Sequence, residues 1–266
     1  MGTRRRLATV ALLVFAAAAF ATGAHAEVIQ SGDVRVNFLA RFMPTTLPRE
    51  TPAPITVEVG GKISTTDDGT PPPALRSLRV ELNSAGRIDA AGLPSCPASL
   101  LQSTESKGAI ARCGPAEVGD GTFQALLRFG GTPLLVKGEA LVFNSTIGGR
   151  PGMLVHIYIA APARVTLVIP LKIDHQPGKF GTVLTASIPT LIGGLGSVTE
   201  LRLRIGRRFE YRGARRSYLS AACAAPPGFP GGPFSFARGV FGFEGRLTMH
   251  LTLTRNCQVR KPAGSG

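Results

Sequence analysis

The amino-acid sequence predicts an all-β protein built as a sandwich or barrel of antiparallel strands, with an antiparallel β-sandwich or jelly-roll-like arrangement preferred. Three observations support this prediction. Apolar runs of strand length recur along the 266 residues, several of them alternate between apolar and polar side chains, and 33 glycines and 21 prolines punctuate the chain as turn signals do.

The first strand pattern is the clearest. Between residues 34 and 42 every second side chain is apolar, which places Val34, Val36, Phe38, Ala40 and Phe42 on one face of a half-buried strand. Further strands are expected at 55–59, 78–82, 122–129, 134–143, 153–159, 165–173, 180–188, 198–205, 234–243 and 247–254.

Two segments depart from this regular pattern. The only helix-permissive region lies between Cys96 and Cys113, where we expect one or two short helices. The apolar strand 165–173 contains Pro170. Because proline has no N–H to donate, we expect this strand to lie at a sheet edge or to contain a bulge.

The first 26 residues have the pattern of a secretory signal peptide. Arginines at 4–6 precede an apolar stretch at 7–21, and Ala24-His25-Ala26 is a small-x-small motif that predicts cleavage after Ala26. The apolar stretch is shorter than the roughly 20 residues of a spanning helix, so we expect a secreted, extracytoplasmic protein without a transmembrane anchor.

The mature chain, 27–266, is expected to form a single large β domain, with two packed β-sandwiches that meet near 92–115 as the alternative. Its four cysteines allow three pairings, and an oxidising compartment favours disulfides. We favour the nearest-neighbour pairing because short loops close at the lowest entropic cost. This pairing joins Cys96 to Cys113 and Cys223 to Cys257.

Positive charge is in excess and is concentrated in one segment. The whole chain carries +14, of which the signal arginines contribute three, leaving +11. Seven arginines follow Glu200 within sixteen residues: Arg202, Arg204, Arg207, Arg208, Arg212, Arg215 and Arg216. Since guanidinium groups bind phosphate and carboxylate bidentately, these arginines are the candidate surface for an anionic cell-wall polymer or an acidic polysaccharide. The alternative is a solvated face paired with acids elsewhere.

No catalytic, metal or cofactor motif stands out, so no catalytic residue, metal or cofactor is expected. His156 lies in an apolar run typical of the interior, and His250 lies on the polar face of a strand. His175 follows Asp174, but neighbours on a strand point to opposite faces and make a poor catalytic dyad. The cysteines have neither the spacing nor the neighbouring histidines of a zinc site.

Several stretches resemble a group of exported actinobacterial proteins with no assigned activity. They are Gly92–Pro97, Cys113–Pro115, Phe180–Ala186, Arg207–Gly213 and Ser217–Cys223. The resemblance spans nearly the whole mature chain. It implies a bacterial, extracytoplasmic protein and carries over no functional residues.

The leading interpretation is a non-enzymatic binding protein of the cell envelope or the secreted fraction that contacts anionic polymers through the arginines. Intracellular nucleic acid is not an expected partner, and the sequence leaves the oligomeric state open. One alternative is a secreted hydrolase that brings His156 or His175 together with Asp174 or Glu139. The other is a carbohydrate-binding module that stacks sugars on tyrosines, since the chain has no Trp.

Overall fold

The computed structural model describes residues 27–260, apart from 68–69 and 130–131. Strands make up 64% of it and helices 8%, which confirms the all-β prediction. The predicted signal peptide and its cleavage site lie largely outside the described residues, which start at Glu27.

The strands are, in chain order, β1 (Glu27–Ser31), β2 (Val34–Met43), β3 (Thr46–Leu47), β4 (Ala53–Pro54), β5 (Thr56–Thr65), β6 (Leu75–Asn83), β7 (Gly86–Ile88), β8 (Glu117–Phe129), β9 (Thr132–Ile147), β10 (Arg150–Ile159), β11 (Val165–His175), β12 (Phe180–Ser187), β13 (Gly196–Ile205), β14 (Arg208–Tyr211), β15 (Ala214–Ser217), β16 (Leu219–Ala221), β17 (Gly231–Phe243) and β18 (Thr248–Val259). The helices are α1 (Ser106–Cys113) and the single 3₁₀ turns η1 (Ala98–Leu100), η2 (Gly114–Ala116), η3 (Ile192–Gly194) and η4 (Glu244–Arg246).

Thirteen strands form one large sheet in the order β1-β2-β5-β13-β8-β9-β10-β11-β12-β6-β17-β18-β3. Its strand pairs are antiparallel except for the short parallel pair of β3 with β18. Two small sheets accompany it, β14-β15 and β4-β16-β7. Every strand predicted from the sequence is present, most of them longer than expected.

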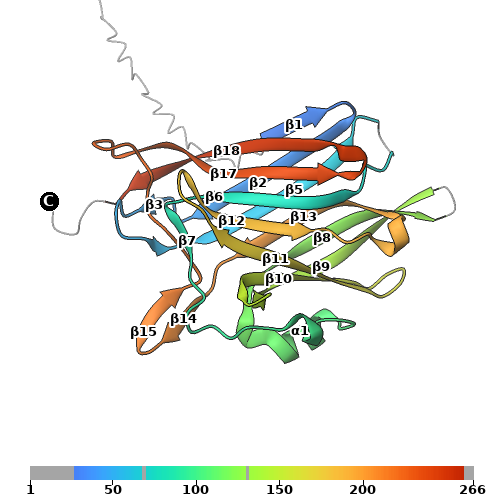
Figure 1. Cartoon of the computed structure of the whole chain (residues 1–266), viewed down its shortest axis with the longest axis horizontal. Coiled ribbons are helices and arrows are strands. Elements are labelled where there is room, and N and C mark those ends of the chain that lie inside the picture. The colour runs from blue at the N-terminus through green and yellow to red at the C-terminus, as the bar shows by residue number, and fades with distance from the viewer. Residues whose placement is uncertain (1–26, 68–69, 130–131, 261–266) are drawn as a thin grey trace, which may run out of the picture.

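The large sheet curls until its two ends meet (Figure 1). Arg255 of β18 forms an ion pair with Glu27 of β1, with Nη1 2.7 Å from the carboxylate, and its Nε donates to the carbonyl of Ala40. The five alternating residues of β2 are each less than 5% exposed, as predicted, and face the inside of the curl. The sheet therefore buries one apolar face against itself.

Aromatic contacts join the two halves of the curled sheet. The ring of Phe38 on β2 meets that of Phe241 on β17 edge-on, with centroids 5.4 Å apart. Phe42 packs against Phe234 and Phe236 of β17 in tilted pairs, with centroids 5.9 and 5.2 Å apart. Such pairs add about 0.5–1.5 kcal/mol each beyond the area that they bury.

A short cap covers part of the outer face. It consists of residues 96–113 with η1 and α1, it is closed by the Cys96–Cys113 disulfide, and it packs Leu101 and Ala109 against Phe143 and Leu154 of the sheet. The expected short helices between the two cysteines are confirmed. The second disulfide joins Cys223 to Cys257, so the predicted pairing is also confirmed.

The expectation for Pro170 was wrong in its first part. Strand β11 lies inside the sheet between β10 and β12 rather than at an edge. Its pairing with β12 begins only at Leu171, whereas Pro170 is still paired with Leu154 of β10. Pro170 therefore lies just outside the part of β11 that pairs with β12. Its missing N–H removes no hydrogen bond between β11 and β12.

A buried carboxylate stabilises the outer face of β6. Glu81 is 2% exposed and accepts hydrogen bonds from Nε of Arg79 at 2.8 Å and Nε of Arg238 at 2.6 Å. Burial alone would raise the pKa of Glu81, but the hydrogen bonds and charges of the two arginines outweigh it and lower the pKa below 4.5. Glu81 therefore stabilises the fold above pH 4.5, and this stabilisation is lost as the pH falls through the lowered pKa.

We predict that Glu81→Gln lowers the free energy of unfolding by about 1–2 kcal/mol at pH 7. The loss is smaller than for a fully buried pair because both arginines are more than 40% exposed. Urea unfolding at pH 7 and at acid pH measures it, and the difference from the parent should shrink in acid. In the control Glu244→Gln, the lost ion pair with Arg76 is exposed, so the change should stay below about 0.5 kcal/mol. Equal effects of the two substitutions would contradict this role of Glu81.

Candidate functional site

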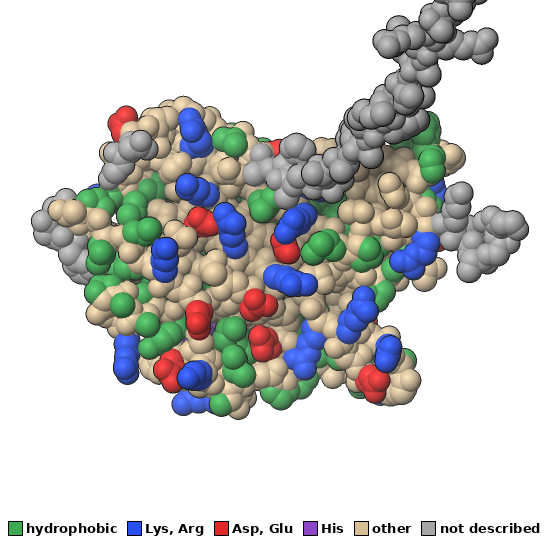
Figure 2. All heavy atoms as spheres, turned by 180° about the vertical axis from the view of Figure 1, so that it is seen from behind, with side chains coloured by type: hydrophobic (Ala, Val, Ile, Leu, Met, Phe, Trp, Pro, Cys, Tyr) green, Lys and Arg blue, Asp and Glu red, His purple; other side chains and the backbone are tan. Residues whose placement is uncertain are grey.

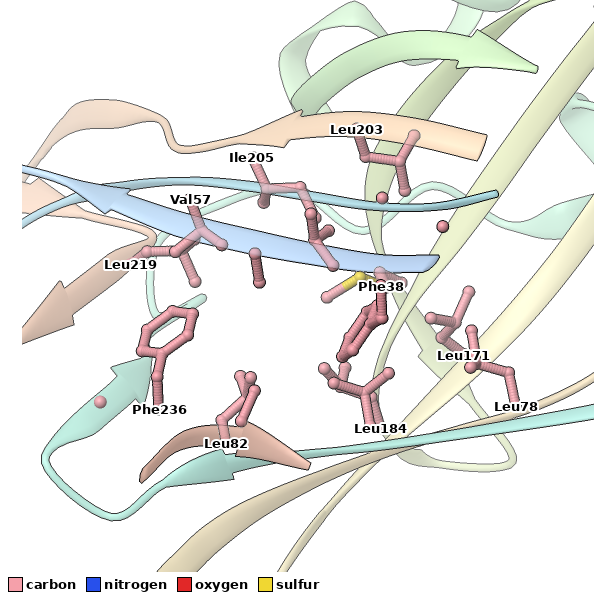
Figure 3. A pocket seen from close by; sticks show the side chains of 18 of the residues that line it. Phe38, Val57, Leu78, Leu82, Leu171, Leu184, Leu203, Ile205, Leu219 and Phe236 are labelled. Atoms are coloured by element: carbon pink, nitrogen blue, oxygen red, sulfur yellow. The ribbon is translucent and has the colours of Figure 1, made fainter. Parts of the chain in front are cut away.

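The inside of the curled sheet holds an apolar cavity, which we call the chamber. Its volume is about 190 Å³, and forty residues line it. In Figure 3, Val57, Leu203 and Ile205 point into it from one half of the sheet, and Leu82 and Leu184 point into it from the other.

Several lining side chains are only partly buried although they face inward. Val57, Leu82 and Leu184 belong to this group. Interiors are normally packed to crystal-like density, and a core residue on an inward face is normally covered completely. The incomplete cover of these residues therefore marks space that the chain's own side chains leave unfilled.

Only three of the forty lining residues are polar: Asn83, Arg87 and Ser220. They lie close together, since Asn83 ends β6, Arg87 is the middle residue of β7, and Ser220 is its register partner on β16. The side chains of Arg87 and Ser220 share the strand face opposite to inward-pointing Leu219, and Arg87 is exposed to solvent. We call this end of the chamber the mouth.

The mouth is built by the small sheet β4-β16-β7. Both polar atoms of the Asn83 side chain are hydrogen-bonded to the backbone. Its Nδ2 donates to the carbonyl of Ser235 at 2.8 Å, and its Oδ1 accepts from the N–H of Ala85 at 2.9 Å. The Cys223–Cys257 disulfide ties the chain just after β16 to β18. For Arg87, the described residues provide no hydrogen bond or ion pair.

The seven predicted arginines do not form one continuous ridge. Arg202 and Arg204 lie on the outer face of β13, while Leu203 and Ile205 between and after them are buried inward, as expected. Arg202 pairs with Glu200 at 2.5 Å. Arg204 lies in register between acidic residues of β5 and β8. Figure 2 shows the same alternation, with basic and acidic side chains interspersed across that face.

Arg207 has a structural role. Its guanidinium is partly buried and donates to the backbone carbonyls of Gly114 at 3.0 Å and Glu117 at 2.6 Å. It thereby holds the junction between β13 and β14 against η2. A side chain with its donors used in this way is a poor contact for a polymer.

The remaining four arginines belong to the hairpin of β14 and β15, which projects from the sheet (Figure 1). Arg208, Arg212, Arg215 and Arg216 are all exposed. The guanidinium groups of Arg212 and Arg216 stand 5.1 and 5.5 Å from the centre of the Tyr211 ring, on which they stack. A Cβ at Gly92 would lie 2.3 Å from Cγ of the Tyr211 ring, so only glycine lets the chain pass there.

The hairpin adjoins the mouth. Arg216 pairs with Asp89 at 3.1 Å, and the Asp89 N–H donates to the carbonyl of Tyr218 at 2.9 Å. Asp89 follows β7 directly, and Tyr218 precedes β16. The hairpin arginines and Arg87 therefore belong to the same end of the molecule.

The histidines are far apart. His156 is fully buried beneath the cap, and its Nε2 lies 2.9 Å from the carbonyl of Thr104. His156 is paired with Val168, so exposed His175 lies about 23 Å further along β11 at roughly 3.3 Å per residue. Asp174 contacts Arg150 at 3.4 Å. Within the described chain, neither histidine bonds to Asp174 or Glu139, so the structure does not assemble the hydrolase site considered above.

The tyrosines offer little surface for stacking sugars. Tyr218 is fully buried, and burial raises the pKa of its hydroxyl strongly. One face of Tyr211 carries arginines, and Tyr158 is half-buried beside Glu139 and Lys137 in a shallow polar hollow. These positions do not form the flat aromatic platform that a carbohydrate-binding module needs.

Residues 27–260, as far as they are described, contain no group of three or more His, Cys, Asp or Glu side chains arranged to hold a metal ion. None of the described helices has the length and apolar character needed to cross a membrane. Comparison with protein-family models, curated proteins and solved structures finds no match to this chain.

The chamber and Arg87 were missed in the sequence. The alternating strands indicate which side chains face inward, but not whether those side chains fill the space that they enclose. The position of Arg87 at one end of the chamber depends on the small sheet, whose strands are only two or three residues long.

We predict a pH effect at His156. Burial lowers its pKa below 6.5, although the hydrogen bond to Thr104 acts in the opposite direction. As the pH falls below 6.5, the unfolded chain binds a proton at this residue that the folded chain does not, so the folded state loses up to about 1.4 kcal/mol per pH unit.

His156→Gln should remove this loss between pH 6.5 and the lowered pKa, which denaturant unfolding across that range measures. The control is His250→Gln, since His250 is exposed on β18. It should keep the parent's pH dependence. An unchanged pH dependence in His156→Gln would contradict the assignment.

Proposed function

We propose that this is a non-enzymatic, extracytoplasmic binding protein that holds an apolar ligand in the chamber of its curled sheet. The observation that carries the proposal is the cavity of about 190 Å³, whose lining surface is almost wholly apolar. Ligand sites are typically concave and apolar, with a few polar groups that orient the ligand. The two disulfides indicate an extracytoplasmic environment, in agreement with the signal peptide expected from the sequence.

The energetic cost of the cavity supports a ligand. At about 24 cal/mol per Å³, an empty space of about 190 Å³ costs about 4–5 kcal/mol. The net stability of a domain is only about 5–15 kcal/mol. An apolar occupant would recover part of this cost. An apolar cavity of about 150 Å³ binds benzene, which makes this chamber large enough for a short hydrocarbon chain or ring.

We predict that Val57→Phe combined with Leu184→Phe lowers the affinity for the small uncharged fluorescent probe 1-naphthylamine at least tenfold. Both side chains point into the chamber from opposite halves of the sheet (Figure 3), so the added rings occupy the ligand's space. Fluorescence titration measures the affinity. Because the rings fill a void, the double variant should melt no lower than the parent.

The matched control is Val28→Phe with Leu195→Phe, at side chains that are 54% and 45% exposed and lie outside the chamber. It should bind the probe as the parent does. Probe affinity that is unchanged in the chamber variant, with its fold intact, would refute the chamber as the binding site.

A second candidate function is contact with an anionic cell-wall polymer or acidic polysaccharide through the hairpin. Within the described chain, Arg208, Arg212 and Arg215 form no ion pair, and their exposed side chains project on a hairpin away from the main sheet. Arg202, Arg204 and Arg207 are less suited, because acids or backbone carbonyls already compensate them. The hairpin therefore replaces the longer ridge as the candidate surface.

We predict that changing Arg208, Arg212 and Arg215 together to Ser lowers the salt concentration at which the protein leaves a heparin column. The logarithm of the affinity should also fall less steeply with the logarithm of salt concentration, by about two to three in slope, because fewer counterions are released. Changing three exposed arginines outside the hairpin, Arg35, Arg128 and Arg164, to Ser gives the same net charge. If the two triple variants elute together, binding depends on net charge and the hairpin is not a specific surface.

A further inference from the structure

We propose that the end of the β8–β9 hairpin docks on the surface of a lipid bilayer that contains anionic phospholipids. Three exposed leucines, Leu134, Leu135 and Leu195, form the contact, and we call them the leucine tip. β13 runs from this tip toward the β14–β15 hairpin, so the two surfaces lie at opposite ends of the sheet (Figure 1). The leucine tip also lies outside the lining of the chamber, so the inference goes beyond the function proposed above.

Exposed apolar side chains gather at the end of the β8–β9 hairpin. Among the described residues, eight large apolar side chains are exposed, and three of them are the leucines of the tip, at 42%, 49% and 45%. Leu134 is the register partner of Leu127, and the N–H of the next residue, Arg128, donates to the carbonyl of Leu195 at 2.8 Å. Single exposed apolar residues need no explanation, whereas a contiguous group marks an interaction site.

The β8–β9 hairpin extends beyond its neighbours in the sheet (Figure 1). β9 is paired with β10 only as far as Glu139, so Leu135 lies about 13 Å beyond the last pair at roughly 3.3 Å per residue. On the other side, the pairing of β8 with β13 ends at Leu127. The leucine tip therefore stands clear of the body of the sheet, where an extended surface can reach it.

The leucines lie on both faces of the β8–β9 hairpin. Because successive residues of a strand point to opposite sides, Leu134 shares one face with buried Leu127, and Leu135 shares the other with half-buried Leu126. A second copy of the chain or another folded partner would cover one face and leave the other in water. The boundary between headgroups and acyl chains of a bilayer surrounds a projecting hairpin and covers both faces.

Basic side chains flank the leucine tip. Arg128 lies near the end of β8, and Lys137 lies on β9 beyond its last pair with β10. Arg164 lies in the turn between β10 and β11, whose Ala160 lines the same shallow hollow as Lys137. All three basic side chains are exposed, and within the described chain none of them forms an ion pair. They are therefore free to attract anionic lipid headgroups, which draw basic side chains to a membrane surface.

The segments around the leucine tip carry no negative charge of their own. Three of them contain neither Asp nor Glu: 121–138, 160–173 and 186–199. Within the β8–β9 hairpin the acids nearest to its end are Asp120 and Glu139, both well short of the leucines. Acids at the same end of the sheet, such as Asp33 and Asp67, belong to turns on the far side of β13. An anionic surface can therefore approach the leucine tip, whereas a cationic one would be repelled.

Vesicle sedimentation of the disulfide-bonded protein tests the proposal. We expect it to bind mixed vesicles of phosphatidylcholine and phosphatidylglycerol at least tenfold more tightly than vesicles of phosphatidylcholine alone, and to lose this preference in high salt. Changing the three leucines of the tip together to Ser should lower the affinity for mixed vesicles at least tenfold. The control is Val28→Ser, Leu100→Ser and Phe229→Ser, at side chains that are 54%, 40% and 61% exposed elsewhere in the chain. It should bind as the parent does.

A second pair of variants tests the charge. Arg128→Gln with Arg164→Gln should remove most of the preference for mixed vesicles and leave binding to phosphatidylcholine alone unchanged. The control of equal net charge is Arg208→Gln with Arg215→Gln on the β14–β15 hairpin, and it should keep the preference. An equal loss in both pairs would show that net charge alone drives adsorption and would overturn the proposal.

A fluorescent label reports whether the leucine tip enters the bilayer. All four cysteines are held in disulfides, so Leu135→Cys can carry the only reactive thiol and be labelled with nitrobenzoxadiazole. The emission of this dye rises and shifts to the blue when it leaves water. We expect that change on mixed vesicles and not on heparin, and we expect no change for labelled Val28→Cys on β1.

Three results would overturn the proposal. The parent does not sediment with mixed vesicles, the leucine variant melts and binds as the parent does, or the label at residue 135 stays in water on vesicles that the protein binds. If the parent self-associates without lipid and the leucine substitutions abolish that association, the leucine tip is an interface between copies, and the membrane proposal fails. None of these results bears on the chamber, whose lining excludes the leucine tip.

Discussion

The constraint on which the rest of the structure depends is that one sheet must hide its own apolar face. A layered fold usually buries that face against a second sheet or against helices. Here the thirteen strands curl until β18 reaches β1, and the Glu27–Arg255 ion pair and the Phe38–Phe241 contact lie where the two ends and the two halves meet. The chamber is a consequence of this geometry, because a curled sheet encloses a volume that only its own inward side chains can fill.

The two faces of the sheet follow different electrostatic rules. The inner face is apolar, while the outer face carries acidic and basic side chains close together. Glu81 between Arg79 and Arg238, and Glu58 beside Arg41, show how outer carboxylates hold the basic side chains of neighbouring strands. Among the described residues, exposed arginines without an ion pair occur on the hairpin, as Arg208, Arg212 and Arg215, and also elsewhere, as Arg35, Arg128 and Arg164.

Much of the fold was predictable, and particular residues show why. The alternation in β2 identified its buried face correctly because a strand has a period of two whatever sheet it joins. The pairing of the four cysteines was predictable because short loops close at the lowest entropic cost. The order of strands in the sheet was not predictable, since strands far apart in sequence become neighbours, as β13 does with β5 and β8. Pro170 illustrates the limit, because its tolerance depends on where a neighbouring ladder ends.

The candidate site was predictable only in part. The arginines were visible as a cluster in sequence, but their division into paired, structural and exposed members depends on acids and carbonyls from distant segments. Arg207, for example, is held by carbonyls about ninety residues away. Arg87 gave no signal at all, because a lone arginine after a turn is ordinary until the structure places it beside an apolar cavity.

The meeting of β1 with β18 also bears on how the protein is made. Glu27 and Arg255 are 228 residues apart in sequence, so the curl cannot close until nearly all strands have been delivered. Contacts of such long sequence separation slow folding and leave apolar surface exposed in the meantime. Until β18 arrives, the apolar face of the early strands stays open to solvent, so the last strand to be made is the one that seals the core.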